Sequence, residues 1–386
     1  MGNALPMCAD MAVNTLNDSP SGVLPTKVVP HLYGKWIGQL LDDSIPLEQA
    51  ATCDSCAMCA REKSESKRQA FYFNPAIKCC TYIPELPNFL VGAILDNENG
   101  DMAFGRNSIE QRLATGVGVT PLGLSPSPSF TLLYRNSPAA FGRSQTLSCP
   151  HYMTETGRCG IWQYRAPPCI TWFCKHNRGA VGRDFWRELH LLLVAIQQSV
   201  AVWCMSKLEM DIEVMRTVLN QPQRIDAEIN ISGDVLDGNA DESWRRSVWG
   251  NWYGREEEFY QRCASLLKGL DWRDVETVCG AEVQIRAQIV KAAHHKLIAN
   301  DSPTRLYTGN FQTVNTTEDH VTVTTYSPYD PLDIPKPVME ALAYFNGRPL
   351  TEALDIVNRQ KNIPLNSNML HTLLDFGVLV EEHEDS

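Results

Sequence analysis

Cysteine is the residue type most able to do chemistry in this chain, because nine of its thirteen cysteines lie between positions 53 and 174. The first group comprises Cys53, Cys56 and Cys59, spaced as C-x2-C-x2-C, and the adjacent pair Cys79 and Cys80. The second comprises Cys149, Cys159, Cys169 and Cys174. Thiolates bind soft metals, and unprotected thiols oxidise, so such a dense set needs an explanation. The sequence predicts that these nine residues bind a metal or an iron–sulfur cluster.

The spacing of the first group favours iron over zinc. A C-x2-C-x2-C run is similar to the opening of a bacterial ferredoxin motif, in which one loop reaches three irons. Zinc rarely takes three ligands from such a run, because the middle thiol points awkwardly. We therefore expect a [4Fe-4S] cluster, with Zn2+ as the alternative. The second group, with gaps of nine, nine and four residues, either holds a second metal or completes the first site.

Buried structural thiols are the alternative explanation, because free cysteine is among the most buried residue types. We apply it to the isolated cysteines, which are Cys8, Cys204, Cys263 and Cys279. For the nine grouped residues the spacing favours metal.

The second group also carries a family resemblance. Its residues are Cys149-Pro150-His151, then Gly157-Arg158-Cys159-Gly160-Ile161-Trp162-Gln163-Tyr164-Arg165-Ala166-Pro167-Pro168-Cys169, then Phe173-Cys174. This run resembles the second half of the YkgJ-type cysteine-cluster family, whose pattern is C…G-x-C-x-I-Y-x-x-R-P-x-x-C…C. The resemblance implies zinc or iron chelation, with four further ligands drawn from the first group. The chain departs from the pattern by the displaced pair at 79–80 and by Ala166 between Arg165 and Pro167.

Four further residues are candidates for tuning or completing the site. Arg158 and Arg165 would raise the reduction potential of an anionic thiolate cluster, unless Arg165 pairs with a surface carboxylate. His151 and His176 each follow a cysteine by two residues, so each either replaces a thiolate or lies just outside the ligand set. His294 and His295 are adjacent on a predicted helix, where side chains point apart and cannot easily chelate one ion.

Composition limits the class of protein. The chain has 386 residues, 44% of them hydrophobic, and a net charge of −11, with no basic run for a nucleic-acid backbone. Its most apolar window, 189–205, is interrupted by Gln197-Gln198-Ser199, so we expect no membrane span. No secretory signal is visible at the N-terminus. We expect a cytoplasmic protein, and in a reducing compartment dense cysteines indicate metal rather than disulfides.

Helical periodicity and breaker residues divide the chain into four parts. We expect an N-terminal arm with a short helix (1–50), a cysteine-rich metal-binding domain (51–180), a helical domain ending in a β-hairpin (181–329) and a C-terminal module (330–386). The predicted fold class is mainly α with an irregular, metal-stapled N-terminal region, and α+β overall. Long helices are predicted over 184–220, 256–269 and 272–299, and hairpin strands over 306–314 and 320–326.

The last segment shows three short helical patterns and a strand, over 338–345, 350–358, 364–376 and 378–380. That order is typical of a winged helix-turn-helix. The run Leu342-x2-Phe345-Asn346-Gly347-Arg348-Pro349-Leu350 resembles the small peptide-binding (PqqD-like) domains of pyrroloquinoline-quinone chaperones. The resemblance implies a peptide or protein partner that adds as a strand. Ten acidic against four basic residues disfavour DNA. A dimerising or purely packing domain is the alternative.

Two functions follow. The first is a redox or modification and maturation enzyme with an iron–sulfur centre that acts on a peptide or protein. The second is a non-enzymatic adaptor with structural zinc and a protein-interaction module. Whether the chain is an enzyme stays open at this point. The tryptophan- and arginine-rich stretch 244–255 is either a partner surface or, as we prefer, a loop that holds helices together.

Overall fold

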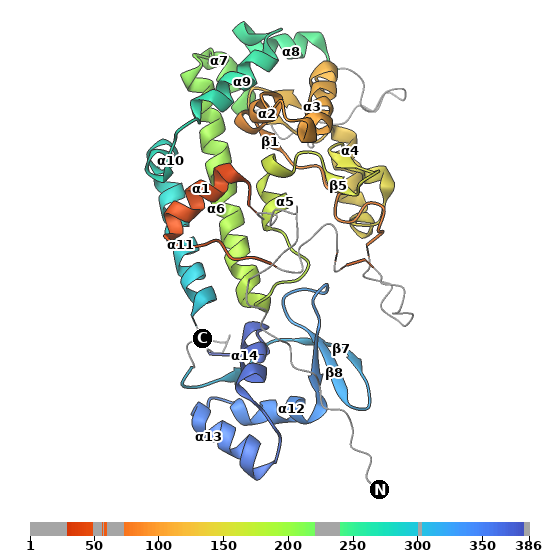
Figure 1. Ribbon diagram of the computed structural model, residues 1–386, viewed down its shortest axis with the longest axis vertical. Coiled ribbons are helices and arrows are strands. Elements are labelled where there is room, and N and C mark those ends of the chain that lie inside the picture. The colour runs from red at the N-terminus through yellow and green to blue at the C-terminus, as the bar shows by residue number, and fades with distance from the viewer. Residues whose placement is uncertain are drawn as a thin grey trace.

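The computed structural model describes residues 29–48, 56, 58–59, 73–220, 240–299 and 303–381 (Figure 1). Cys8 and Cys53 lie outside these ranges. The fold is α+β, as predicted, with helices predominating and small antiparallel sheets. Two large hydrophobic cores form among the described residues, one within residues 29–297 and one within residues 306–379. Two small clusters lie apart from them, one around Ile77 and Cys149 and one around Ile83 and Phe130.

The helix α6 (Gly179–Lys207) is the axis of the larger core (Figure 1). Its apolar residues recur at helical spacing and are fully buried, among them Phe185, Leu189, Leu192 and Ile196. It packs against α5 (Pro167–Thr171), α9 (Glu256–Leu266), α10 (Trp272–Cys279) and α11 (Ala281–Ile298).

By length and composition alone α6 could cross a membrane, with a mean hydropathy of 1.5. In the folded chain, 56% of the apolar 18-residue window of α6 is buried inside the protein. Its apolar character is therefore accounted for by the core, and among the described residues it is the only helix with this property.

The helix expected over 184–220 differs at both ends. It begins earlier, at Gly179, and it stops at Lys207 because Glu209 adopts a left-handed conformation (φ 53°). A separate helix, α7 (Ile212–Leu219), follows, and the Asp211 side chain caps it by accepting from two backbone N–H groups. The helix expected over 272–299 is likewise two helices, split at Gly280 (φ 73°) into α10 and α11.

The N-terminal cysteine-rich region is more regular than predicted. Its elements are β1 (Leu86–Pro87), α2 (Asn88–Leu95), α3 (Ala103–Thr115), β2 (Val119–Thr120), β3 (Gly123–Leu124), α4 (Pro128–Asn136), β4 (Tyr152–Met153) and β5 (Arg158–Cys159). The prediction of an irregular region was wrong for 86–124, which forms two helices and a small sheet and whose apolar residues join the larger core. The sequence of α2 is apolar on every side, so it shows no helical period.

The remaining helices of this core agree with expectation in part. α1 (His31–Leu41) buries Tyr33, Trp36, Ile37 and Leu40, and α9 and α10 begin where predicted. The stretch 244–255 forms α8 (Glu242–Trp249) and a short turn, and it buries Trp249 and Trp252 against Phe259 (ring centroids 5.5 and 5.2 Å apart). The stretch is therefore mostly helical and not the loop that we expected, and two of its tryptophans pack into the larger core.

The C-terminal part contains β6 (Tyr307–Thr308), β7 (Gln312–Thr316), β8 (His320–Thr324), β9 (Leu332–Pro335), α12 (Lys336–Ala341), α13 (Leu350–Asp355), α14 (Ser367–Asp375) and β10 (Leu379–Val380). β7, β8 and β9 form one antiparallel sheet, and β6 pairs with β10. The expected boundary at 329/330 therefore falls inside a sheet, and the smaller core includes Leu306 and Val323 from the hairpin side. α14 lies against the start of α6 (Figure 1).

Candidate metal centre

Backbone hydrogen bonds bring the two cysteine groups together. The N–H of Cys149 donates to the carbonyl of Cys80 (2.9 Å), which joins positions 69 residues apart. Cys159 lies on the hairpin β4–β5, opposite Tyr152. Cys169 lies in the short helix α5, and Cys59 is bridged to Phe73. Four separate chain segments thus present thiols to one region.

The charge of Cys79 influences the pKa of several other thiols. Burial raises the pKa of five thiols, and the charge of Cys79 raises each of them further: Cys59, Cys149, Cys159, Cys169 and Cys174. A hydrogen bond to Cys79 raises the pKa of Cys80. The charge of Cys56 also raises the pKa of Cys59 and of Cys174. Five of the nine predicted ligands, Cys79, Cys80, Cys149, Cys159 and Cys169, also line one cavity.

The thiol of Cys79 is the most acidic of this group. The Cys80 thiol donates a hydrogen bond to it, and against the effect of burial this bond lowers the pKa of Cys79 to about 7. Arg165 and Lys78 add positive charge in the same direction. Burial raises the pKa of Cys149 and of Cys174 to about 12. At neutral pH most of these thiols are therefore protonated, and a metal would bind by displacing their protons.

The donor set suits a soft metal, because the group consists of thiols. Within the described ranges, however, no three His, Cys, Asp or Glu side chains already stand in a coordinating arrangement. Side-chain rotation at the cysteines would therefore have to accompany binding. The five thiols that line one cavity exceed the four that one tetrahedral zinc ion takes.

Arg165 is the predicted tuning residue that lies inside the site. It is 8% exposed, its guanidinium lies 3.4 Å from the centre of the Trp162 ring, and it donates to the carbonyl of Cys169 (3.0 Å). Its charge lowers the pKa of Cys79, Cys159 and Cys169 against the effect of burial. Arg165 is buried, whereas the alternative of a pair with a surface carboxylate would require an exposed side chain. Arg158, on β5, is exposed instead.

His151 is buried (1% exposed), and its Nδ1 lies 2.8 Å from the Ser108 hydroxyl. That hydroxyl also bonds to the Gly105 carbonyl (2.6 Å), to which it must donate its single proton. Nδ1 of His151 therefore carries a proton, and Nε2 keeps its lone pair. Burial, with Arg112 nearby, lowers the pKa of His151 to about 4. A neutral imidazole with a free Nε2 suits either role predicted for His151.

His176 is 8% exposed, and its Nδ1 has no hydrogen-bond partner among the described residues. Its backbone N–H donates to Asp330 (3.4 Å), and its ring packs edge-on against Phe173 and Tyr326. Burial, with a contribution from Arg183, lowers the pKa of His176 to about 4. His176 therefore lies where the cysteine region meets the C-terminal part.

A cavity of about 900 Å³ opens beside the thiols. Its lining includes Cys79, Cys80, Cys149, Cys159 and Cys169, together with His151, Arg165 and His176. Residues that sequence reasoning missed complete it from α6 and from the turn after β8, namely Arg183, Arg187, His190, Tyr326 and Tyr329. The spacing of the α6 residues at i, i+4 and i+7 was a readable signal of a shared face.

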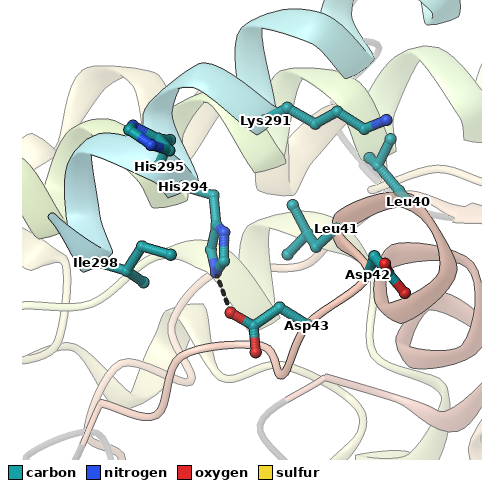
Figure 2. Close-up of a pocket in the computed structure, with 8 residues that line it drawn as sticks. All are labelled: Leu40, Leu41, Asp42, Asp43, Lys291, His294, His295 and Ile298. Carbon is teal, nitrogen blue, oxygen red and sulfur yellow. Dashed lines mark ion pairs between the residues drawn. The ribbon is translucent and has the colours of Figure 1, made fainter.

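A smaller pocket of about 390 Å³ lies between the end of α1 and α11. Figure 2 shows His294 pointing into it toward Asp43, at 3.9 Å, while His295 turns away. The two histidines therefore point apart, which is the arrangement expected for adjacent residues on a helix. The isolated cysteines Cys204 and Cys263 are fully buried in the larger core, and Cys279 packs against that core, in agreement with their structural interpretation.

No family model matches the chain, and no curated protein or solved structure matches it either.

Proposed function

We propose that this chain is an iron–sulfur protein whose cluster is held by the cysteine group around Cys79. The observation that carries the proposal is that five thiols from three chain segments, those of Cys79, Cys80, Cys149, Cys159 and Cys169, line one cavity. More thiols gather there than one zinc ion needs, and the ferredoxin-like spacing of the first group favours iron. A bound [4Fe-4S] cluster would supply one-electron transfer.

The large cavity beside the thiols supports a reaction rather than a purely structural site. Structural metal sites are closed, whereas a reaction centre needs space for a substrate. Within this proposal, Arg165 supplies positive charge beside the thiolates, and His151 is either a ligand or a neighbour of the ligands. The chain then acts as a redox or modification and maturation enzyme in the cytoplasm, without nucleic acid or membrane.

A peptide or protein is the proposed substrate, recruited by a winged-helix-like C-terminal module. The support is the free edge of its sheet, where β7 is exposed at all five positions and carries no charged residue. Unprotected edge strands of this kind accept an added strand. The turn that follows β8 lines the cavity, so a peptide held by this module would lie close to the cysteine group.

The second candidate is an adaptor with structural zinc. The absence of a ready coordination arrangement among the described residues applies equally to the iron–sulfur enzyme and to this adaptor. Anaerobic purification, followed by a visible spectrum and by iron, labile sulfide and zinc analysis, distinguishes them. We expect a brown protein with broad absorption near ~400 nm and labile sulfide. A colourless protein that holds only zinc would favour the adaptor, and a protein without either metal would contradict both.

A further inference from the structure

The cavity has a chemical character that the proposed metal does not explain. Its described lining includes four guanidinium groups, those of Arg135, Arg165, Arg183 and Arg187, and it includes no Asp or Glu side chain. Arg165 faces the thiols, where it offsets thiolate charge. The other three face a cavity whose described lining has no carboxylate, so they favour an anion inside it.

Helix α6 supplies one wall of the cavity. Arg183, Trp186, Arg187 and His190 follow one another at i, i+3, i+4 and i+7, so they share one face of the helix. Arg183 and Arg187 pair only with their sequence neighbours, at 2.8 Å to Asp184 and 2.9 Å to Glu188, among the ion pairs of the described residues. Neither of those carboxylates lines the cavity. The arginine side chains remain 41% and 59% exposed, so a ligand can reach them.

Aromatic rings supply another part of the lining. Trp172 is 41% exposed although it is large and apolar. It is held edge-on by Phe141 (5.1 Å) and Tyr329 (6.2 Å), and it lies parallel to Phe73 at 6.5 Å. A tryptophan fixed in this way and open to a cavity is a platform on which a flat ring can stack.

We propose that the cavity binds a small organic anion that carries an aromatic ring. Its anionic group lies at Arg183 and Arg187, and its ring lies against Trp172. Guanidinium groups bind carboxylate, sulfonate or phosphate oxygens through charge-assisted hydrogen bonds. The volume of about 900 Å³ falls in the range of small-molecule sites, and residues from several elements line it. The proposal does not depend on the metal, because the residues that it uses are not thiols.

The probe for this site is 8-anilinonaphthalene-1-sulfonate, a ring-bearing anion, and the control is N-phenyl-1-naphthylamine, which has the same rings without the sulfonate. Both are titrated by fluorescence into the full-length protein, with and without prior metal removal. We expect the sulfonate to bind at one site per chain and more tightly than the neutral amine. Binding without metal would uphold this site even if the metal analysis failed.

The variants locate the binding. The double variant Arg183→Gln with Arg187→Gln should weaken sulfonate binding at least tenfold and change amine binding less than twofold. Arg216→Gln, an exposed arginine on α7, is the matched control and should change neither. Trp172→Ala should weaken both. Equal binding of sulfonate and amine, or sulfonate binding that the double variant leaves unchanged, would overturn the proposal.

Salt dependence in the wild type keeps the test decisive if the double variant does not fold. The affinity for the sulfonate should fall several-fold between low and high salt, whereas that for the amine should not. A salt-independent sulfonate affinity would overturn the proposal.

Discussion

Arg178, at the start of α6, and Asp375, at the end of α14, are joined by two parallel hydrogen bonds, from Nη2 to Oδ1 (2.6 Å) and from Nε to Oδ2 (2.9 Å). The same guanidinium also donates to the carbonyls of Leu297 and Ala299. It therefore ties together the ends of α6, α11 and α14, which belong to two different cores. The pair holds the C-terminal part against the start of α6 and the end of α11.

Replacing Asp375 with Asn should lower the free energy of unfolding by about 1–3 kcal/mol, because a half-buried guanidinium loses its charged partner. Urea unfolding measures this change, and hydrogen exchange should rise in α14. The matched control is Asp355→Asn, whose exposed partner Arg359 makes an ordinary surface pair. Equal effects of the two substitutions would show that the Arg178 contact does not join the two cores.

Gly92 is required by the packing of α2 against α9. A Cβ at this position would lie 1.8 Å from the carbonyl oxygen of Tyr260. Gly92→Ala should therefore destabilise the protein by several kcal/mol, on the order of 3 or more. Gly38→Ala, in α1, meets nothing within 4 Å and should stabilise it by about 0.5–1 kcal/mol. Thermal unfolding measures the stability of both variants. A Gly92→Ala protein as stable as the wild type would contradict the packing of α2 against α9.

Arg165 should tune the metal centre through its charge. Arg165→Gln should lower the reduction potential of a bound cluster by tens of millivolts, because the positive charge that favours the reduced, more anionic state is lost. Arg158→Gln, on the exposed side of β5, should leave the potential unchanged. Protein-film voltammetry measures both. Equal potentials in the wild type and the Arg165 variant would remove Arg165 from the site.

His151 should make stability depend on pH in the acid range. Its pKa in the folded state is about 4, below the usual 6.5, because burial disfavours the imidazolium. Above pH 6.5 both states are neutral and the full stability is present. As the pH falls from 6.5 toward 4 the unfolded state binds the proton first, so about 3 kcal/mol is lost. Urea unfolding against pH should show a shallower loss for His151→Gln. Parallel curves for the two proteins would contradict this assignment.

The sequence predicted the elements with strong periodicity and clear caps. The starts of α9 and α10 followed from such signals, and the capping box of Asp271 and Asp274 marks the second. α2 was not predicted, because a short segment that is apolar at every position from Phe89 to Leu95 has no helical period. The break at Glu209 escaped because a left-handed residue there leaves the apolar spacing nearly intact.

The candidate site was predicted in its residue types but not in its geometry. Spacing singled out the cysteines within each group. The backbone hydrogen bond from Cys149 to Cys80, however, joins segments far apart in the chain, and no local pattern specifies it. The contributions of Ser108, Trp172 and the α6 face were missed for the same reason. A residue that lines a cavity is defined by what folds opposite it, and the sequence does not display that partner.

The metal content of matched cysteine variants tests the central claim most directly. The wild type, Cys79→Ser and Cys263→Ser are purified anaerobically, and iron, labile sulfide and zinc are measured per chain. We predict about four iron and four sulfide in the wild type. We also predict the loss of most of both in Cys79→Ser and a wild-type content in Cys263→Ser, whose thiol is buried in the helical core. A Cys79→Ser protein as fully loaded as the wild type, or a wild type without iron, would contradict the account.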